Sequence, residues 1–339
     1  MRELLIRVDG GSSIGSGHIS RCLAIAKEAE KLGVLSRFLV STDESYAMLP
    51  NRARASILGS NPFNLRGSDA DRIVGFWQSG ALLVDSYGVS FPFFQRLRDS
   101  GIRTCYIDDD YLFKTERHEI LRWPVDVLVD YRFCVDRDRL RGVYAETGAE
   151  VLAGPEFAPV AERFVGVGRN PTSGVSNILV TTGSTNPAGS LERIVRACRK
   201  AFPSARVKAT VGRFAHFDAG MYGFGQKRVK LLHGVSDLAP LMREADLVVS
   251  AAGTTLYELC AAGVPSFAVP IVENQLENAR GFAEAGCGGA LLDLNWAEKE
   301  LVEGLRSIAG IEVRRSFCSR MRSVVPGDGA RKIVEALLG

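Results

Sequence analysis

The stretch Gly10-Gly11-Ser12-Ser13-Ile14-Gly15-Ser16-Gly17-His18 follows a short apolar run and precedes an unbroken helical pattern. A strand, a glycine-rich turn and a helix, in this order, form the ligand-binding corner of open α/β folds. Glycine accepts positive φ and lets the backbone approach a ligand, and the free N–H groups at the helix start attract negative charge. The stretch therefore predicts a binding corner near the start of the chain.

His18 stands at the predicted helix start, directly after the glycines. An unperturbed imidazole titrates at a pKa of about 6.5, so a histidine at such a corner can take or give a proton near neutral pH. The alternative is that the turn is only tight and that His18 is a polar cap. The spacing alone leaves both interpretations open.

The composition limits the class of protein. The chain has 339 residues, 46% of them apolar, which is enough for two domains. Its seven cysteines form no Cys-x-x-Cys pair and its four histidines have no metal-ligand spacing, so we expect neither disulfides nor structural zinc. A dispersed net charge of +3 argues against nucleic-acid binding. Without a signal-like start or a run of about 18 apolar residues, we expect a cytoplasmic protein with no stable membrane insertion.

Acidic residues follow several short apolar runs in the first half of the chain. The runs lack polar alternation and are separated by helical segments, which is typical of a parallel sheet covered on both faces. Their carboxyl ends meet at one edge, where open α/β folds bind ligands. We therefore expect four side chains to gather at the edge that carries His18: Asp85, Tyr87, Asp108 and Asp109. Each acid alone could instead be a helix N-cap.

The pattern breaks up between the two halves, where glycine and proline are frequent. This change predicts an N-terminal domain over residues 1–160, a linker over 161–176 and a C-terminal domain over 177–339. A last helix, about 330–338, is expected to pack back on the N-terminal domain.

The second half repeats the strand, turn and helix arrangement. The turn Gly183-Ser184-Thr185-Asn186 follows an apolar run and precedes a helix, which suits a phosphate. The run Gly253-Thr254-Thr255 follows another strand and leads to Glu258, whose carboxylate could accept hydrogen bonds from a ribose diol or could be an ordinary first-turn acid. Asn274-Gln275 open a further helix, and their amides suit sugar hydroxyl or N-acetyl groups.

Together these motifs resemble those of the pseudaminic-acid pathway (PseG-like) hydrolases, which remove UDP from UDP-2,4-diacetamido-2,4,6-trideoxy-β-L-altropyranose. The most specific part is residues 7–9 with 14–18 and 21–23, supported by 84–87, 107–109, 245–247 and 273–275. That family is similar to the MurG-type N-acetylglucosaminyltransferases. The resemblance implies a GT-B-like α/β fold in which two Rossmann-like domains face each other across a cleft.

The resemblance also implies roles for individual residues. It makes His18 the general base or water-orienting residue, with Tyr87 in the same pocket. By this resemblance, Glu258 binds the ribose, and the turn 183–186 binds the diphosphate together with Thr254-Thr255. The hexose is bound by Asn274-Gln275. Its N-terminal motifs add further candidate substrate-binding residues: Asp9, Gly15, Gly17, Arg21, Asp85, Asp108 and Asp109.

The function expected from the resemblance is metal-independent hydrolysis of a UDP-sugar, with water attacking C1 and inverting the anomeric centre. No cofactor is expected, and the partner is the UDP-sugar substrate of a monomeric enzyme. A glycosyltransferase of the same architecture would use an acceptor hydroxyl in place of water, and a non-catalytic sugar-nucleotide-binding protein is a third possibility. The sequence does not identify the sugar's stereochemistry or the base.

Overall fold

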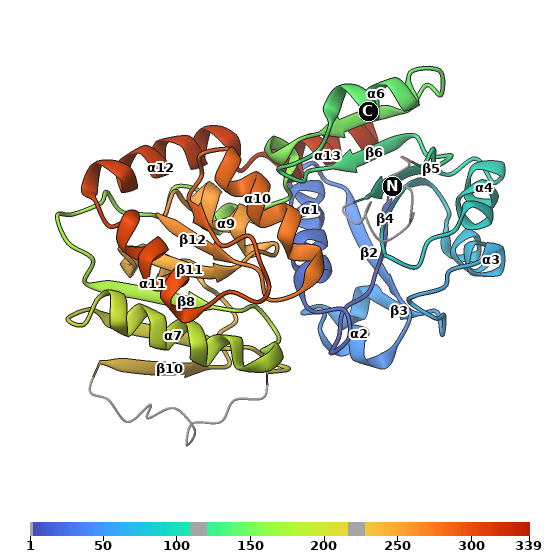
Figure 1. Cartoon of the computed structure of the whole chain (residues 1–339). Coiled ribbons are helices and arrows are strands. Elements are labelled where there is room, and N and C mark those ends of the chain that lie inside the picture. Colours follow the sequence, from blue (N-terminus) through green and yellow to red (C-terminus); the bar gives the residue numbers. More distant parts are fainter. Residues whose placement is uncertain (1–2, 109–120, 216–227) are drawn as a thin grey trace. The chain divides into compact units, whose positions relative to one another are not determined.

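The computed structural model describes residues 3–108, 121–215 and 228–339, and Asp109 lies outside these ranges. The chain divides into two compact units (Figure 1). The first consists of Met1–Ala161 with Asp328–Gly339, and the second of Glu162–Gly327. Each unit is built around a parallel sheet, as the apolar runs without polar alternation predict.

The first unit has a seven-stranded sheet of order β3-β2-β1-β4-β5-β6-β7, with every adjacent pair parallel. Its strands are β1 (Glu3–Val8), β2 (Leu35–Val40), β3 (Ala55–Ile57), β4 (Gly80–Asp85), β5 (Arg103–Ile107), β6 (Val127–Asp130) and β7 (Glu150–Ala153). Its helices are α1 (Gly17–Lys31), α2 (Asp43–Ala47), α3 (Gly67–Phe76), α4 (Phe91–Asp99), α6 (Arg137–Tyr144) and α13 (Gly329–Leu338), with 3₁₀ turns at Arg52–Arg54 and Pro155–Phe157.

The pleat of this sheet sorts the side chains onto two faces, because successive residues of a strand point to opposite sides. Leu5, Leu82 and Val84 lie in the buried cluster formed with α3 and α4. Val8 is paired with Asp85, so Asp85 lies on the opposite face, which α1 covers. The face that a residue occupies decides its neighbours in the site.

Helix α13 belongs to the first unit, although it is the last element of the chain. It packs against α1 and against the central strands of the seven-stranded sheet. Arg103 donates from Nε to the carbonyl oxygen of Leu337 and from Nη2 to that of Ala336, both at 2.9 Å. A guanidinium at a helix C-terminus satisfies the free carbonyl groups and complements the helix dipole.

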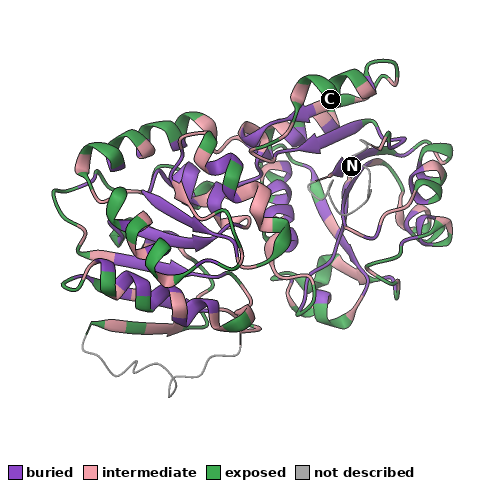
Figure 2. Ribbon diagram, viewed as in Figure 1, coloured by how far each residue is buried: buried purple, intermediate pink, exposed green. Residues whose placement is uncertain are grey.

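The second unit has a six-stranded parallel sheet of order β10-β9-β8-β11-β12-β13. Its strands are β8 (Asn177–Thr181), β9 (Arg206–Val211), β10 (Val229–His233), β11 (Leu247–Ala251), β12 (Ser266–Val269) and β13 (Gly289–Ala290). Its helices are α7 (Ser190–Ala201), α8 (Ala239–Glu244), α9 (Thr255–Ala262), α10 (Leu276–Glu284), α11 (Glu298–Ser307) and α12 (Ile311–Val324), with 3₁₀ turns at Glu162–Phe164, Pro187–Gly189 and Glu273–Gln275. Figure 2 shows buried strands between helices whose outer sides are exposed.

The predicted linker, residues 161–176, lies almost entirely within the second unit. From Glu162 on it belongs to the second unit, where Gly166 and Gly168 donate to the carbonyl oxygens of Ala261 and Ala262, both at 2.9 Å. A Cβ on Gly168 would lie 2.7 Å from the Ala262 oxygen, so this close approach requires glycine. The glycines that suggested a linker here permit tight packing.

Candidate functional site

Both sheets reverse their strand order at the place where ligands bind in open α/β folds. In the first unit β1 neighbours β4, and the loops that follow these strands carry the glycine-rich stretch and Tyr87. In the second unit β8 neighbours β11, and the loops that follow carry the turn 183–186 and the Thr254-Thr255 pair. The motifs singled out from the sequence therefore lie at the two switch points.

His18, in the first turn of α1, is paired with Asp85 at the end of β4. The distance from Nδ1 of His18 to Oδ1 of Asp85 is 2.6 Å, and the two residues are 4% and 1% exposed. Two lone pairs would repel each other at this distance, so the contact assigns the proton to Nδ1, which donates to the carboxylate. In the neutral tautomer that carries this proton, the other ring nitrogen, Nε2, has the lone pair.

Nε2 of His18 is buried and has no hydrogen-bond partner among the described residues. A buried polar atom without a partner costs free energy, which suits a site whose partner is a ligand. The half-buried ring of Tyr87 lies edge-on to the imidazole, with centroids 4.5 Å apart and an interplanar angle of 88°. The structure thus brings together the two residues predicted to share a pocket, and the pair can accept a proton at Nε2.

Arg21, one turn after His18, is directed at Asp85. Its Nε donates to Oδ2 of Asp85 at 2.6 Å, its Nη2 contacts Oδ1, and its Nη1 donates to the hydroxyl of Tyr131. Arg21 is only 4% exposed. The side chain predicted to contact substrate is therefore engaged with the partner of His18.

The charge on Asp85 depends on these neighbours. Burial raises the pKa of this carboxyl, but Arg21 and then His18 lower it, and the balance holds the pKa well below its usual range. Cys22 also faces Asp85, with Sγ 3.4 Å from Oδ2. Burial and then the Asp85 charge raise the pKa of the Cys22 thiol. The carboxylate is thus ionised beside the Arg21 guanidinium.

The glycine-rich stretch is fixed by contacts that the sequence motif does not reveal. Gly11 and Gly15 exchange two backbone hydrogen bonds, of 3.0 and 2.7 Å, so the amide of Gly15 is used within the loop. Ser45 accepts from the Gly10 amide at 3.2 Å and donates to the Gly10 carbonyl at 2.7 Å. Glu44 accepts from the Ser12 amide at 2.9 Å. Helix α2 therefore holds the loop, and Gly17 begins α1.

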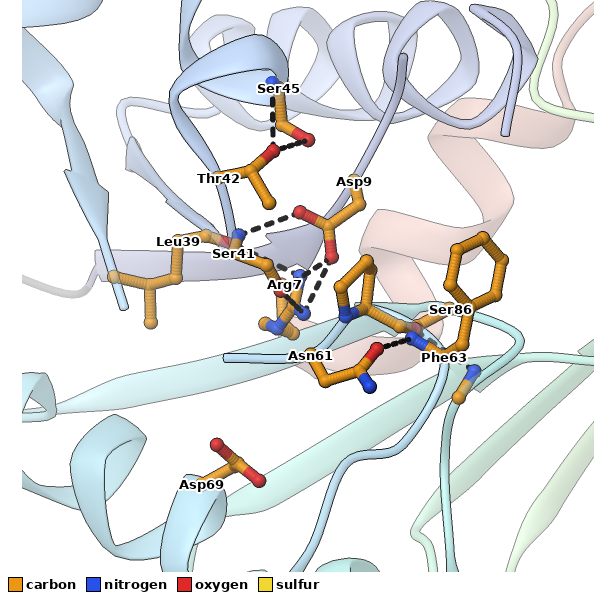
Figure 3. A network of polar contacts seen from close by, with 12 residues as sticks. Arg7, Asp9, Leu39, Ser41, Thr42, Ser45, Asn61, Phe63, Asp69 and Ser86 are labelled. Atoms are coloured by element: carbon orange, nitrogen blue, oxygen red, sulfur yellow. Dashed lines mark hydrogen bonds and ion pairs between the residues drawn. The ribbon is translucent and has the colours of Figure 1, made fainter. Parts of the chain in front are cut away.

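Asp9 lies on the other face of the sheet from Asp85. Its Oδ1 accepts from the Ser41 amide at 2.6 Å, and its Oδ2 accepts from the Ser41 hydroxyl at 2.9 Å and lies 2.6 Å from Nη2 of Arg7 (Figure 3). Arg7 and Asp9 are 0% and 3% exposed. These contacts join β1 to the end of β2, so the structure does not bring Asp9 into the His18 cluster.

Asp108 reaches the predicted edge but points to the same side as Asp9. Its Oδ2 accepts from Nε1 of Trp123 at 2.9 Å, and its Oδ1 accepts from the Tyr106 hydroxyl at 3.4 Å. Both aromatic residues belong to the cluster formed with α3 and α4. Of the described acids predicted at this edge, Asp85 alone contacts His18.

In the second unit, the turn after β8 is held largely by its own groups. The hydroxyl of Thr182 donates to the carbonyl of Thr185 at 2.8 Å, and Gly183 is exposed with φ +78°. Asn186 accepts from the Leu191 amide and donates to Glu192, both at 2.8 Å. Asn186 thus caps α7, while Gly183, Ser184 and Thr185 form the accessible part of the turn.

The corner between β11 and α9 is more open. Thr254 and Thr255 are half-buried, and the first turn of α9 has no side-chain cap. Glu258 is half-buried, and its carboxyl has no hydrogen-bond partner among the residues that the structure describes. Burial raises the pKa of Glu258 to about 7, with Arg163 opposing the shift and Asp237 adding to it.

Helix α10 supports this corner. The Tyr257 hydroxyl donates to Oδ1 of Asn278, whose Nδ2 donates to the carbonyl of Ala252, both at 2.7 Å. Gln275 lies beside Gly253, where a Cβ would be 3.6 Å from its Nε2, and it accepts from the Ile271 amide at 3.1 Å. Asn274 is exposed in the preceding turn. Tyr257 and Asn278 thus tie α9 and α10 to the loop after β11, which spacing alone does not reveal.

Within the described ranges, no group of three or more His, Cys, Asp or Glu side chains could hold a metal ion. No helix in that part of the chain is long and apolar enough to cross a membrane.

Comparisons with known proteins agree with this architecture. Residues 177–313 match the model of the glycosyltransferase family 28 C-terminal domain. The chain is 24% identical over 98% of its length to the spore coat polysaccharide biosynthesis protein SpsG of Bacillus subtilis (strain 168), covering 96% of that protein. It is 25% identical over 80% of its length to the pseudaminic acid cytidylyltransferase and UDP-2,4-diacetamido-2,4,6-trideoxy-beta-L-altropyranose hydrolase of Helicobacter pylori, covering 45% of that protein.

Among solved structures, Acinetobacter baumannii MurG superposes with a TM-score of 0.71 and 16% identity, over 99% of each chain. The predicted GT-B fold with two Rossmann-like domains is therefore confirmed. The second unit resembles the C-terminal domain of glycosyltransferase family 28.

Proposed function

We propose that this protein hydrolyses a UDP-linked 2,4-diacetamido-2,4,6-trideoxyhexose to UDP and the free sugar. The observation that carries the proposal is the His18–Asp85 pair, which leaves the buried Nε2 of a neutral imidazole available as a base. Support also comes from the residue motifs and from the similarity to a Helicobacter pylori protein whose name includes this hydrolase activity.

In the proposed reaction, Nε2 of His18 accepts a proton from water as the water oxygen attacks C1 of the sugar. The C1–O bond breaks, its electron pair leaves with UDP, and the anomeric centre inverts. Asp85 stabilises the imidazolium that forms, as a buried carboxylate paired with Nδ1 does in other histidine bases. A positioned base of this kind contributes roughly 10² to 10⁴ in rate.

In this proposal, the second unit binds the nucleotide. The backbone N–H groups of the turn 183–185 and of the uncapped start of α9 suit the diphosphate. The Glu258 carboxylate suits the ribose diol, and Asn274 with Gln275 suit the hexose. Because UDP is already a good leaving group, stabilising the diphosphate charge and positioning one water are the two main tasks.

A glycosyltransferase that uses a UDP-sugar donor and a hydroxyl acceptor is the second candidate, and the family 28 match favours it. An apolar surface for a lipid acceptor would support it further. In the segment Phe91-Pro92-Phe93-Phe94, Phe93 and Phe94 are fully buried, and Phe91 is 54% exposed. This segment therefore offers one exposed aromatic side chain.

The test is hydrolysis in ¹⁸O-labelled water, followed by mass spectrometry of both products and NMR of the first-formed anomer. Hydrolysis at C1 places the label in the free sugar with inverted configuration. Label in UDP would mean attack at phosphorus and would overturn the mechanism. Release of UDP only when a hydroxyl acceptor is added would identify the glycosyltransferase instead. Retention of configuration would point to a covalent intermediate on Asp85, the one described acid that contacts His18.

A further inference from the structure

Arg21 is predicted from the sequence to bind substrate, but in the structure it contacts Asp85 and Tyr131. Three of its atoms, Nε, Nη1 and Nη2, are directed at Asp85 and Tyr131. To bind a substrate group with the same atoms, Arg21 would have to abandon a carboxylate that is 1% exposed. Leaving a buried carboxylate unpaired is costly, so this exchange is disfavoured.

We propose that Arg21 is a positioning residue that holds Asp85 in the orientation in which its Oδ1 receives the Nδ1 proton of His18. The inference rests on the proposed role of His18 as a base and adds a residue to it. Nε and Nη2 bind the two carboxylate oxygens at once, which prevents rotation of the Asp85 carboxylate. The Tyr131 hydroxyl accepts from Nη1 and fixes the far side of the guanidinium.

The contacts around His18 agree with this role. Nη2 of Arg21 lies 3.0 Å from Nδ1 of His18, and both nitrogens converge on Oδ1 of Asp85. One carboxylate oxygen can accept from two donors, so both protons are satisfied. If the carboxylate rotated away, Nδ1 could accept from Arg21, and the proton of the neutral ring would move to Nε2. That tautomer could not act as the base.

The groups that face Asp85 come from two elements and a loop. Helix α1 supplies His18, Arg21 and Cys22, strand β5 supplies Cys105, and Tyr131 follows β6 and reaches Asp85 through Arg21. Burial and then Asp85 raise the pKa of the Cys105 thiol, as they do for Cys22. The thiols are therefore neutral at physiological pH, and Arg21 supplies the permanent positive charge beside the carboxylate.

The experiment compares Arg21→Lys and Tyr131→Phe with the wild type. Lysine keeps the charge but has no fork to bind both carboxylate oxygens, and phenylalanine keeps the ring but removes the acceptor for Nη1. Arg137→Lys is the control, because Arg137 also binds both oxygens of one carboxylate: its Nη1 and Nη2 donate to Glu156 at 2.6 and 2.7 Å, elsewhere in the first unit.

Two measurements separate positioning from substrate binding. The first is the pH profile of kcat for UDP-sugar hydrolysis, with the Kd of UDP measured in parallel. We expect kcat of Arg21→Lys to fall by about 10- to 100-fold, the range for residues that orient a functional histidine through its partner. The acid limb should move to higher pH, because an Asp85 charge that Arg21 offsets less completely favours the protonated form of His18, the proposed base. The Kd of UDP should not change.

The second measurement needs no turnover. An Nδ1–H that is protected from solvent and donates to a buried carboxylate gives a low-field proton resonance, assigned by its loss in His18→Asn. We expect this resonance in the wild type and in Arg137→Lys, a weakened one in Tyr131→Phe, and none in Arg21→Lys. If Arg21→Lys does not fold, Tyr131→Phe carries the test through a smaller shift of the acid limb in the same direction.

An unchanged resonance and pH profile in the Arg21 and Tyr131 variants would overturn the inference. A raised KM with an unchanged kcat in Arg21→Lys would show that Arg21 binds substrate and would also overturn the inference. If the wild type hydrolyses no UDP-sugar, the proposed function fails, whereas the resonance still decides whether Arg21 holds Asp85.

Discussion

The two switch points of this molecule use their polar residues in opposite ways. At the first, His18, Arg21 and Asp85 are almost fully buried and bound to one another. At the second, Thr254, Thr255 and Glu258 are half-buried around an uncapped helix start. A closed network of charges fixes protonation states and geometry, which suits chemistry, whereas open donors and acceptors suit binding. The same strand, turn and helix motif thus occurs in this chain with a closed and with an open set of polar groups.

The largest effect is expected when His18, the proposed base, is removed from the first switch point. His18→Asn should lower hydrolysis by at least about 100-fold, because a positioned base is lost. The Kd of UDP, measured by calorimetry, should stay within a few-fold. His233→Asn, at an exposed histidine in the second unit, is the control. Equal losses of turnover and UDP binding would make His18 a structural residue.

The next largest effect is expected at the second corner. Glu258→Gln should weaken UDP binding by about 1.5 to 3 kcal/mol, the range for hydrogen bonds to a charged group. The wild type should distinguish UDP from 2′,3′-dideoxy-UDP, and the variant should not. Glu284→Gln, at an exposed glutamate of α10, should bind UDP like the wild type. A difference between the two ligands that persists in Glu258→Gln would remove Glu258 from the ribose.

The raised pKa of Glu258 predicts that the stability of the folded protein depends on pH between 4.5 and about 7. Asp85, whose pKa is lowered, makes no such contribution in this range. In the folded protein the Glu258 carboxyl titrates at about 7, against 4.5 for an ordinary glutamate. The folded state therefore binds more protons between these values, and stability falls as pH rises from 4.5 to 7. Over this range, we expect the free energy of unfolding of the wild type, measured with urea, to fall by about 2 kcal/mol more than that of Glu258→Gln. Parallel pH curves for the two proteins would contradict this.

The contribution of the Asp85 carboxyl to stability changes with pH in the opposite direction. Because its folded pKa is lowered, its contribution to stability is present above the unfolded pKa of about 3.9 and is lost as pH falls below it. This difference between the corners follows from their partners: Arg21 offsets burial at Asp85, whereas burial outweighs Arg163 at Glu258.

The smallest effect is expected at the support of the first corner. Ser45→Ala removes both hydrogen bonds to Gly10 and should cost about 1 to 2 kcal/mol of stability, with a modest fall in kcat. Thermal unfolding measures the first effect and steady-state kinetics the second. The control is Ser20→Ala, at an exposed position of α1. Indistinguishable unfolding of Ser45→Ala and Ser20→Ala would show that α2 does not hold the loop.

Sequence patterns alone predict the class of fold, most long elements and the edge on which the candidate site lies. The apolar runs and the helix starting beside His18 correspond to β1, β4, β5 and α1, because local periodicity reports burial on one or two faces. The short edge strands β3 and β7, of three and four residues, carry too little periodicity to be predicted.

What the sequence could not determine is which face each acid occupies. Asp9, Asp85 and Asp108 all follow parallel strands and reach one edge, but the pairing of Val8 with Asp85 and of Val84 with Tyr106 directs them to two sides. A shift of one residue in strand register exchanges the two faces, and register depends on packing across the whole sheet. The tertiary structure therefore decided that Asp85 meets His18 and Arg21, while Asp9 and Asp108 bind Ser41 and Trp123.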